Sequence, residues 1–379
     1  MENNQAIQQK PQKSEDILKF KDLCFKLGFV MLVFFISRII CTLIVGYIHL
    51  HLIDIIGTTA TYILHLSLSA VFLYFIPIIA AAGIFKDENQ PSLKNLYKKP
   101  PRLSKALANF PSMYGLGQIV NLSSLLIAWL FMRLRDLGAS GEESEIIERS
   151  FGTMGSLLPP NLASGIVLFI HMVFAAAIFE ELLCRGILLN ALKPYGNGFA
   201  IIVTGFLFGI MHGNFQQFTY TFVLGMVLAY ITIQTGSILA ATILHGVFNA
   251  VAGIMMVFLS TNAVQERLFY TATSSGETLT QPSDHNMAVF AGFTVFFVVF
   301  IALLVAGIPL AIRRIMRIKV YGTGAALKSD GRYVHSPELT IKRKCLLLIK
   351  SVPVVLMLLL TIDAFVGGFL ASTLFRWIR

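Results

Sequence analysis

Charged residues are scarce in this sequence. Asp, Glu, Lys and Arg make up only 13% of its 379 residues, about half of the roughly 25% that an average soluble domain carries. Hydrophobic residues make up 56%, and the mean hydropathy is +0.74. These values exclude a disordered chain, a fibrous protein and an ordinary soluble enzyme. We therefore expect a polytopic membrane protein.

Cysteine is also scarce, and no two cysteines form a C-x-x-C pair. There are four, at Cys24, Cys41, Cys184 and Cys345, which argues against a disulfide framework and a cysteine zinc site. No H-E-x-x-H motif is present, so a zinc site would have to be assembled from separate helices. The N-terminus lacks the apolar run of a signal peptide, and we expect residues 1–27 to form a disordered cytoplasmic tail.

Long apolar runs are what the chain has in abundance. A spanning helix needs about 20 mostly apolar residues, and nine candidates fit, at 28–50, 62–84, 110–132, 163–192, 199–215, 218–234, 238–260, 287–312 and 347–375. The fifth and sixth are short, so 199–234 is either two full spans or one re-entrant hairpin. The sequence predicts an all-α, polytopic transmembrane helical bundle of about nine spans.

The net charge of +10 is concentrated in loops between these runs. Segments 85–109 and 313–346 are basic, whereas 134–162 is acidic. The positive-inside rule then places both basic loops and the N-terminus in the cytoplasm of a protein of the cell membrane. We attribute the charge to topology and contact with the lipid bilayer. We expect no nucleic acid partner, since no soluble basic face is evident.

Ionisable residues inside apolar spans need a reason, because each costs roughly 2.5–3.5 kcal/mol on insertion scales. The fourth span contains Glu180, Glu181 and Arg185. Glu181 and Arg185 are four residues apart and share a helix face, so they are expected to form a structural ion pair. Glu180 points about 100° away and is available to another partner. The structural alternative is an ion-paired latch between helices.

Two later spans carry the other candidates. His212 follows Phe208 by one helical turn, and His245 and Asn249 share one helix face. Each alone is typical of a core histidine or a polar contact between helices. At a rise of about 1.5 Å per residue, Glu180 and these three polar residues lie roughly 10–20 Å from the inner ends of their spans. They could therefore meet in one polar cavity within the bilayer.

Such a set suits hydrolysis of an amide bond. Glu180 and His212 can hold a water and take its proton, while His245 and Asn249 can stabilise the oxyanion of a tetrahedral intermediate. Alternatively, Glu180, His212 and His245 could bind a divalent metal such as zinc with an open fourth position. Both a cofactor-free site and a zinc site remain open on the residues alone.

The three motifs together resemble those of the CPBP intramembrane protease family. They are Glu180-Glu181-x-x-x-Arg185, Phe208-x-x-x-His212 and His245-x-x-x-Asn249. That family includes the type II CAAX prenyl endopeptidases and lysostaphin-resistance-like or bacteriocin-immunity-like proteins. The resemblance implies a helical membrane fold with its active site inside the bilayer.

When the residue roles of the family are transferred motif by motif, the resemblance implies that Glu180 and His212 activate water. It also implies that His245 and Asn249 stabilise the oxyanion. The implied substrate is a membrane peptide or a lipidated C-terminal tail. The catalytic core would occupy 110–312. Residues 28–109 would add two N-terminal spans and a basic loop, and 313–379 a basic loop and a final span. These additions lie outside what the family core requires.

Two other classes of function compete with a peptidase. Intramembrane Glu and His are usual in proton relays, which would suit a proton-coupled transporter, although no inverted repeat is evident. The additional spans and the long basic loop would suit a non-catalytic membrane scaffold or immunity protein.

Four further polar residues lie in apolar spans. Arg38, His65 and Asp363 are each the single polar residue considered in their part of a span, and His171 is expected to face away from Glu180.

Overall fold

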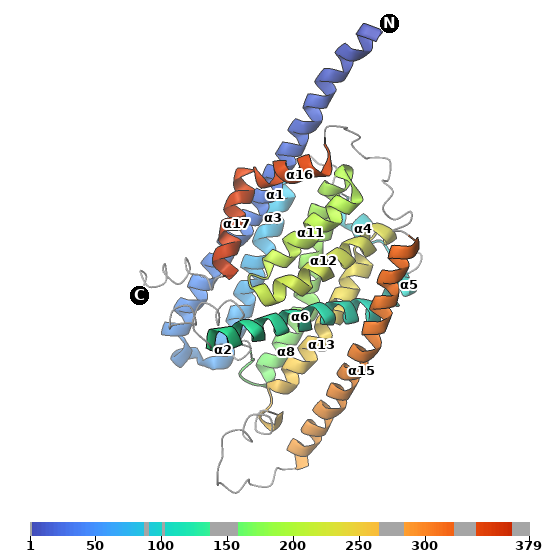
Figure 1. Cartoon of the computed structure of the whole chain (residues 1–379). Helices are drawn as coiled ribbons and strands as arrows, with labels where there is room; N and C mark the ends of the chain where they lie inside the picture. The colour runs from blue at the N-terminus through green and yellow to red at the C-terminus, as the bar shows by residue number, and fades with distance from the viewer. Residues whose placement is uncertain are drawn as a thin grey trace.

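The computed structural model describes residues 2–86, 91–100, 103–136, 158–264, 284–321 and 339–365. These residues are helical or lie in short connections, and no strand occurs among them. The prediction of an all-α helical bundle is thereby confirmed (Figure 1). Most of the predicted acidic loop, residues 137–157, lies outside the described residues, as do residues 322–338 of the predicted basic loop 313–346. The described ends of that basic segment are helical rather than loop, because they continue α15 (Asp284–Tyr321) to its end and begin α16 (Ile341–Ile349).

The N-terminal part of the bundle is built from α1 (Glu2–His51) and a second hydrophobic stretch. That stretch comprises α2 (Ile53–Ala70), the π-helix η1 (Val71–Phe75) and α3 (Ile76–Ile84). Two short helices follow, α4 (Leu93–Leu96) and α5 (Leu103–Leu107). The longer α6 (Phe110–Asp136) then packs against α12 and α15.

The middle of the chain begins with one long span that changes helix type several times. It runs through α8 (Leu162–Ile170), π-helix η3 (His171–Ala176), α9 (Ala177–Glu181), π-helix η4 (Leu182–Leu188), α10 (Leu189–Leu192) and the 3₁₀ turn η5 (Lys193–Tyr195). Then come α11 (Asn197–Met211), α12 (Phe215–Thr235) and α13 (Leu239–Leu259). The described C-terminal helices are α15 (Asp284–Tyr321), α16 (Ile341–Ile349) and α17 (Val352–Phe365).

Not all nine predicted spans meet the criteria of length and apolarity within the described residues. Six helical stretches qualify within the described residues, and a seventh is added if α16 and α17, bent by 72°, count as one span. The two remaining predicted spans are helices but do not qualify. One is α6, and the other is α11, whose 15 residues are fewer than the roughly 20 that cross a bilayer. α11 and α12 are therefore an unequal pair.

The predicted disordered tail over 1–27 is corrected by the structure, because α1 is helical from Glu2. Ion pairs at helical spacing, Glu15 with Lys19 at 2.6 Å and Asp22 with Lys26 at 2.7 Å, lie along its exposed side. From Phe20 onward the other side of the helix is buried. Packing of these apolar residues, which the polar opening of the sequence conceals, extends the helix beyond the predicted span.

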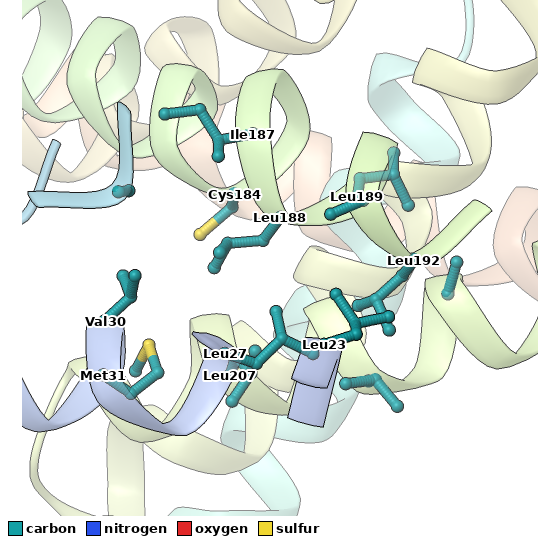
Figure 2. Packing of buried hydrophobic residues seen from close by; sticks show 14 of the residues in the cluster. Leu23, Leu27, Val30, Met31, Cys184, Ile187, Leu188, Leu189, Leu192 and Leu207 are labelled. Atoms are coloured by element: carbon teal, nitrogen blue, oxygen red, sulfur yellow. The ribbon is translucent and has the colours of Figure 1, made fainter. Parts of the chain in front are cut away.

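This buried side of α1 contacts the long central span. Figure 2 shows Val30 and Met31 of α1 facing Cys184 and Leu188, and all four belong to the largest core cluster. At the other end of that cluster the buried Lys344 of α16 donates a hydrogen bond to the Tyr195 carbonyl over 2.5 Å. The N-terminal and C-terminal helices are thus packed directly against the segment that carries the first motif.

Glycines allow two helix pairs to touch backbone to backbone. A Cβ placed on Gly205 of α11 would lie 3.1 Å from the Phe222 carbonyl oxygen of α12, and one on Gly225 would lie 3.0 Å from the Gly205 Cα. A Cβ on Gly115 of α6 would lie 2.1 Å from the Gly307 carbonyl carbon of α15. Small residues at such crossings let membrane helices approach closely. α11 also contacts the central span, at η4 and α10.

Candidate functional site

A cavity of about 440 Å³ lies where the N-terminal helices meet the motif-bearing segment. Its lining residues come from α1, α2, η1, α9, the end of α11 and the start of α12. They include Arg38, His65, Tyr74, Glu180, His212 and Gln217. Two of the four predicted catalytic residues, Glu180 and His212, therefore line the same cavity, whereas His245 and Asn249 do not line it.

Glu180 projects from α9 at the edge of this cavity, with 13% of its side chain exposed. Its Oε2 lies 3.9 Å from Nε2 of His245. The Tyr74 side chain, which comes from η1, lines the same cavity. Glu180 thus faces the open volume on one side and His245 on the other.

His212 lies directly after the last residue of α11 and forms its C-cap. Its Nδ1 lies 2.9 Å from the Phe208 carbonyl oxygen, and its ring packs edge-on against the Phe208 ring at 5.1 Å. A carbonyl can only accept a hydrogen bond, so Nδ1 carries the proton and Nε2 is left as the acceptor of the neutral ring. An acceptor nitrogen of this kind can hold a water through the water's O–H.

Glu181 and Arg185 form the contact expected from their spacing, and both are fully buried. Nη1 of Arg185 donates to Oε1 of Glu181 over 2.7 Å, and Nη2 donates to the Gly225 carbonyl over 2.9 Å. The guanidinium also lies 4.5 Å from the centre of the Phe208 ring. Arg185 thereby ties the central span to both α11 and α12.

His245 belongs to this buried group rather than to the cavity lining. Its Nδ1 lies 3.0 Å from Oε1 of Glu181, which must accept the bond. The other ring nitrogen, Nε2, is thereby turned toward Glu180. His245 is therefore held between two adjacent carboxylates, one buried in an ion pair and one at the cavity.

Asn249 does not join His245. Its Nδ2 donates instead to the Met172 carbonyl of η3 over 2.9 Å. The four-residue spacing does place both side chains on one face of α13, but each finds a different partner on the central span. The predicted convergence of all four residues on one cavity is therefore incomplete in this structure.

Several lining residues were not tied to the site by sequence reasoning. Arg38 and His65 stood out only as single polar residues in apolar spans, and Tyr74 and Gln217 did not stand out at all. No spacing rule links them to the motifs, because they approach from separate helices. Their proximity is visible only in the packed structure.

His171 is connected to the site, contrary to the expectation that it faces away. It precedes Glu180 by nine residues, half a turn out of phase on an α-helix. The intervening residues include the π-helix η3, whose wider turn changes that phase. Nε2 of His171 lies 3.3 Å from the Tyr74 hydroxyl, and Tyr74 lines the same cavity as Glu180.

A metal site is not supported by the arrangement of side chains. Within the described ranges, no three His, Cys, Asp or Glu side chains are grouped so that they could hold a metal ion. Glu180 and His212 face the cavity together, but His245 does not line it. The zinc alternative for Glu180, His212 and His245, and the description as a metalloprotease, thus lack support.

Comparison with known proteins places the three motifs within a recognised segment. Residues 162–251 match the family model described as type II CAAX prenyl endopeptidase Rce1-like. All three motifs lie inside this range, so the resemblance drawn from them is confirmed, and the match supports a CAAX-type intramembrane protease family. No curated protein and no solved structure matches the chain. The cavity residues contributed by α1, α2 and η1 lie outside the matched segment.

Proposed function

We propose that this protein is an intramembrane endopeptidase that hydrolyses a peptide bond in a membrane-associated or lipidated peptide. The observation that carries the proposal is that Glu180 and His212, from two different helices, line one cavity of about 440 Å³. That volume is within the range of about 300–1,000 Å³ typical of small-ligand pockets. The match of residues 162–251 to a CAAX prenyl endopeptidase model supports the same reaction class.

In the proposed reaction, a water is held between the Glu180 carboxylate and the acceptor nitrogen of His212. Glu180 takes one proton from the water as its oxygen bonds to the carbonyl carbon of the substrate. The tetrahedral intermediate then collapses, the C–N bond breaks, and the proton held by Glu180 passes to the leaving amine. The new carboxyl group carries the oxygen of the water, and no covalent bond to the protein is formed.

His245 is the proposed donor to the oxyanion. In its protonated form, Nε2–H would point to the Glu180 side of the site while Glu181 accepts from Nδ1, as an aspartate orients a catalytic histidine. Removing one such donor typically costs about 10²–10³ in rate. Asn249 can add a second donor only if its amide leaves the Met172 carbonyl, to which it is bonded here.

Glu181 and Arg185 are proposed to orient His245 and to hold the central span against α12. Their charges are mutually compensated, so they are not assigned a chemical step. The protein would lie in the cell membrane with a cytoplasmic N-terminus, as the basic loops predict. The substrate would then reach the cavity from the bilayer or as a short exposed tail.

The test is cleavage of a panel of fluorogenic membrane-anchored and prenylated peptides by the purified full chain in nanodiscs. Glu180→Gln preserves the shape of the side chain but removes the base, so we expect cleavage to fall by about 10²–10⁴-fold. Glu15→Gln, which changes an exposed carboxylate on α1, is the matched control and should cleave normally. Unchanged cleavage by a folded Glu180→Gln protein would disprove the proposal.

A further inference from the structure

Arg38 is the cation of the cavity. It lies on α1, outside the segment that matches the family model, and lines the same cavity as Glu180 and His212. Nη1 donates to the Met211 carbonyl over 3.0 Å. This single bond engages one of the five N–H donors of a guanidinium. The side chain is therefore fixed at one corner and retains donors for a second partner.

The turn after α11 is shaped around this guanidinium. Gly213 has φ of +69°, and a Cβ placed on it would lie 2.0 Å from Nη1 of Arg38. A residue with a side chain would be both strained in this backbone conformation and in collision with the arginine. The backbone of Met211 and Gly213 thus holds the guanidinium next to the turn that carries His212.

Arg38 differs from the other buried arginine in its electrostatic partners. Arg185 is neutralised by Glu181 at 2.7 Å. No ion pair of Arg38 occurs in the part of the chain that the structure describes. A cation inside a membrane bundle is costly, and the carboxylate that shares its cavity, Glu180, does not pair with it. An anionic group brought by a ligand would supply the missing charge.

We propose that Arg38 binds the C-terminal carboxylate of the peptide substrate and thereby determines which bond is cut. The inference rests on the proposed peptidase function and deepens it. A guanidinium binds a carboxylate through two parallel hydrogen bonds, a geometry that favours it over an amide. A cavity of about 440 Å³ admits only a short length of peptide. Anchoring the terminus at Arg38 places a bond a few residues upstream beside Glu180 and His212.

The test measures binding and cleavage separately, with short aliphatic peptides that end either in a free carboxylate or in an amide. Binding of fluorescent versions is measured by anisotropy in the Glu180→Gln background, where no turnover is needed. Hydrogen bonds to charged groups contribute about 1.5–3 kcal/mol, so the carboxylate peptide should bind about 10- to 150-fold more tightly. Adding Arg38→Gln should bring that ratio close to one and leave amide binding unchanged.

Arg313→Gln, which removes an exposed cation on α15, is the matched control and should keep the preference. Arg38→Lys, which keeps the charge but not the paired hydrogen bonds, should retain part of it. Binding of the amide peptide serves in each variant as the check that the cavity is intact. A ratio unaffected by Arg38→Gln, or an equal loss for both peptides, would overturn the inference and leave Arg38 as a support for the Met211 turn.

A lipid phosphate is the other anion that could reach this site, so binding is measured in nanodiscs of phosphatidylcholine with and without phosphatidylglycerol. The inference expects little competition by the anionic lipid. Strong competition that disappears in Arg38→Gln would overturn it in favour of a lipid site. Cleavage of the same peptides by the unmodified protein is read independently. Absence of cleavage would refute the peptidase function, whereas the carboxylate preference in binding would still identify the anion site.

Discussion

The N-terminal helices and the matched segment 162–251 face each other across the cavity. They differ in whether their buried charges have an oppositely charged partner. In the matched segment 162–251, Glu181 and Arg185 are fully buried and compensate one another, and His245 is bonded to the same carboxylate. In the N-terminal helices, Arg38 has a backbone carbonyl as its hydrogen-bond partner. The comparison teaches that the opposite charges of the motif-bearing segment compensate each other within that segment, although Oε2 of Glu181 and Nε of Arg185 have no hydrogen-bond partner in the part of the chain that the structure describes. The cation of the N-terminal wall has no such counter-charge among the described residues and keeps donors for a ligand.

The same two regions also differ in helix geometry. α1 is one continuous α-helix of 50 residues, while the central span alternates between α and π turns around Glu180. π turns inside α-helices are frequent at functional sites. Here they change the phase of the residues before and after Glu180, and they bring His171 to Tyr74. The uninterrupted α1 then forms part of the cavity wall opposite this irregular span.

The largest expected difference between the two regions concerns stability. Arg185→Met leaves Glu181 buried without its main counter-charge, and breaking such a pair typically costs about 3–5 kcal/mol. Arg38→Met removes one hydrogen bond to a neutral carbonyl and should cost clearly less. Thermal unfolding of both variants in the same detergent measures the difference. Equal destabilisation would mean that Arg38 is as much a structural residue as Arg185.

A second prediction moves Arg38 without changing it. Gly213→Ala introduces a Cβ that would lie 2.0 Å from the guanidinium, so the side chain must shift. We expect a loss of about tenfold in the preference for carboxylate over amide peptides, since one displaced charge-assisted bond is worth about 1.5 kcal/mol or more. Gly198→Ala on α11, where a Cβ meets nothing within 4 Å, is the control. If Gly213→Ala kept the preference for carboxylate over amide peptides, Arg38 would not be the residue that binds the peptide carboxylate.

A smaller effect is expected at Asn249. Asn249→Ala removes the hydrogen bond to the Met172 carbonyl, which should lower stability by about 0.5–1.5 kcal/mol. If Asn249 only positions α13 against the central span, kcat should fall no more than a few-fold. A loss of 10²-fold or more with little change in stability would show instead that its amide reaches the oxyanion during the reaction.

Tyr74→Phe probes the contact between the two regions with a still smaller change. It deletes the hydroxyl that lies 3.3 Å from Nε2 of His171, on a side chain that shares the cavity with Glu180. Because Glu180 keeps its place at the cavity, we expect a reduction in kcat of less than about tenfold, with KM little changed. His171→Phe should give a similar reduction if Tyr74 is oriented by that ring. Wild-type kinetics in both variants would show that the contact between His171 and Tyr74 has no influence on catalysis.

The smallest effect is expected from chelation. Because no metal-binding group of three side chains is found in the described residues, incubation with a strong chelator should leave cleavage within about twofold of the untreated rate. Glu180→Gln protein treated in parallel provides the inactive baseline. Loss of activity that zinc restores would show that Glu180 and His212 act as metal ligands.

Much of this arrangement could be predicted from the sequence, because part of it follows from local spacing. The all-α fold follows from the apolar runs, and the contact between Glu181 and Arg185 follows from their four-residue separation. The meeting of Glu180 with His212 required only that two spans place them at similar depth. Six or seven of the nine predicted spans meet the length and apolarity criteria within the described residues; α11 is apolar but short, and α6 is not among those that qualify.

The features of the site that could not be predicted from the sequence depend on packing between segments that are distant in sequence. Arg38 is 142 positions from Glu180, and only the burial of α1 against the central span brings both to one cavity. The partner of Asn249 is a backbone carbonyl, which no side-chain pattern can reveal. The phase of His171 was misjudged because an α-helical period was applied across a π-helix.

The central claim is that a peptide occupies a cavity built jointly by the N-terminal helices and the motif segment. It is tested most directly by photocrosslinking a benzophenone-labelled peptide to Glu180→Gln protein and mapping the sites by mass spectrometry. The account predicts crosslinks on both walls, at or beside Thr42 of α1 and Gln217 of α12, and competition by unlabelled peptide. Crosslinks confined to residues outside the cavity would contradict it.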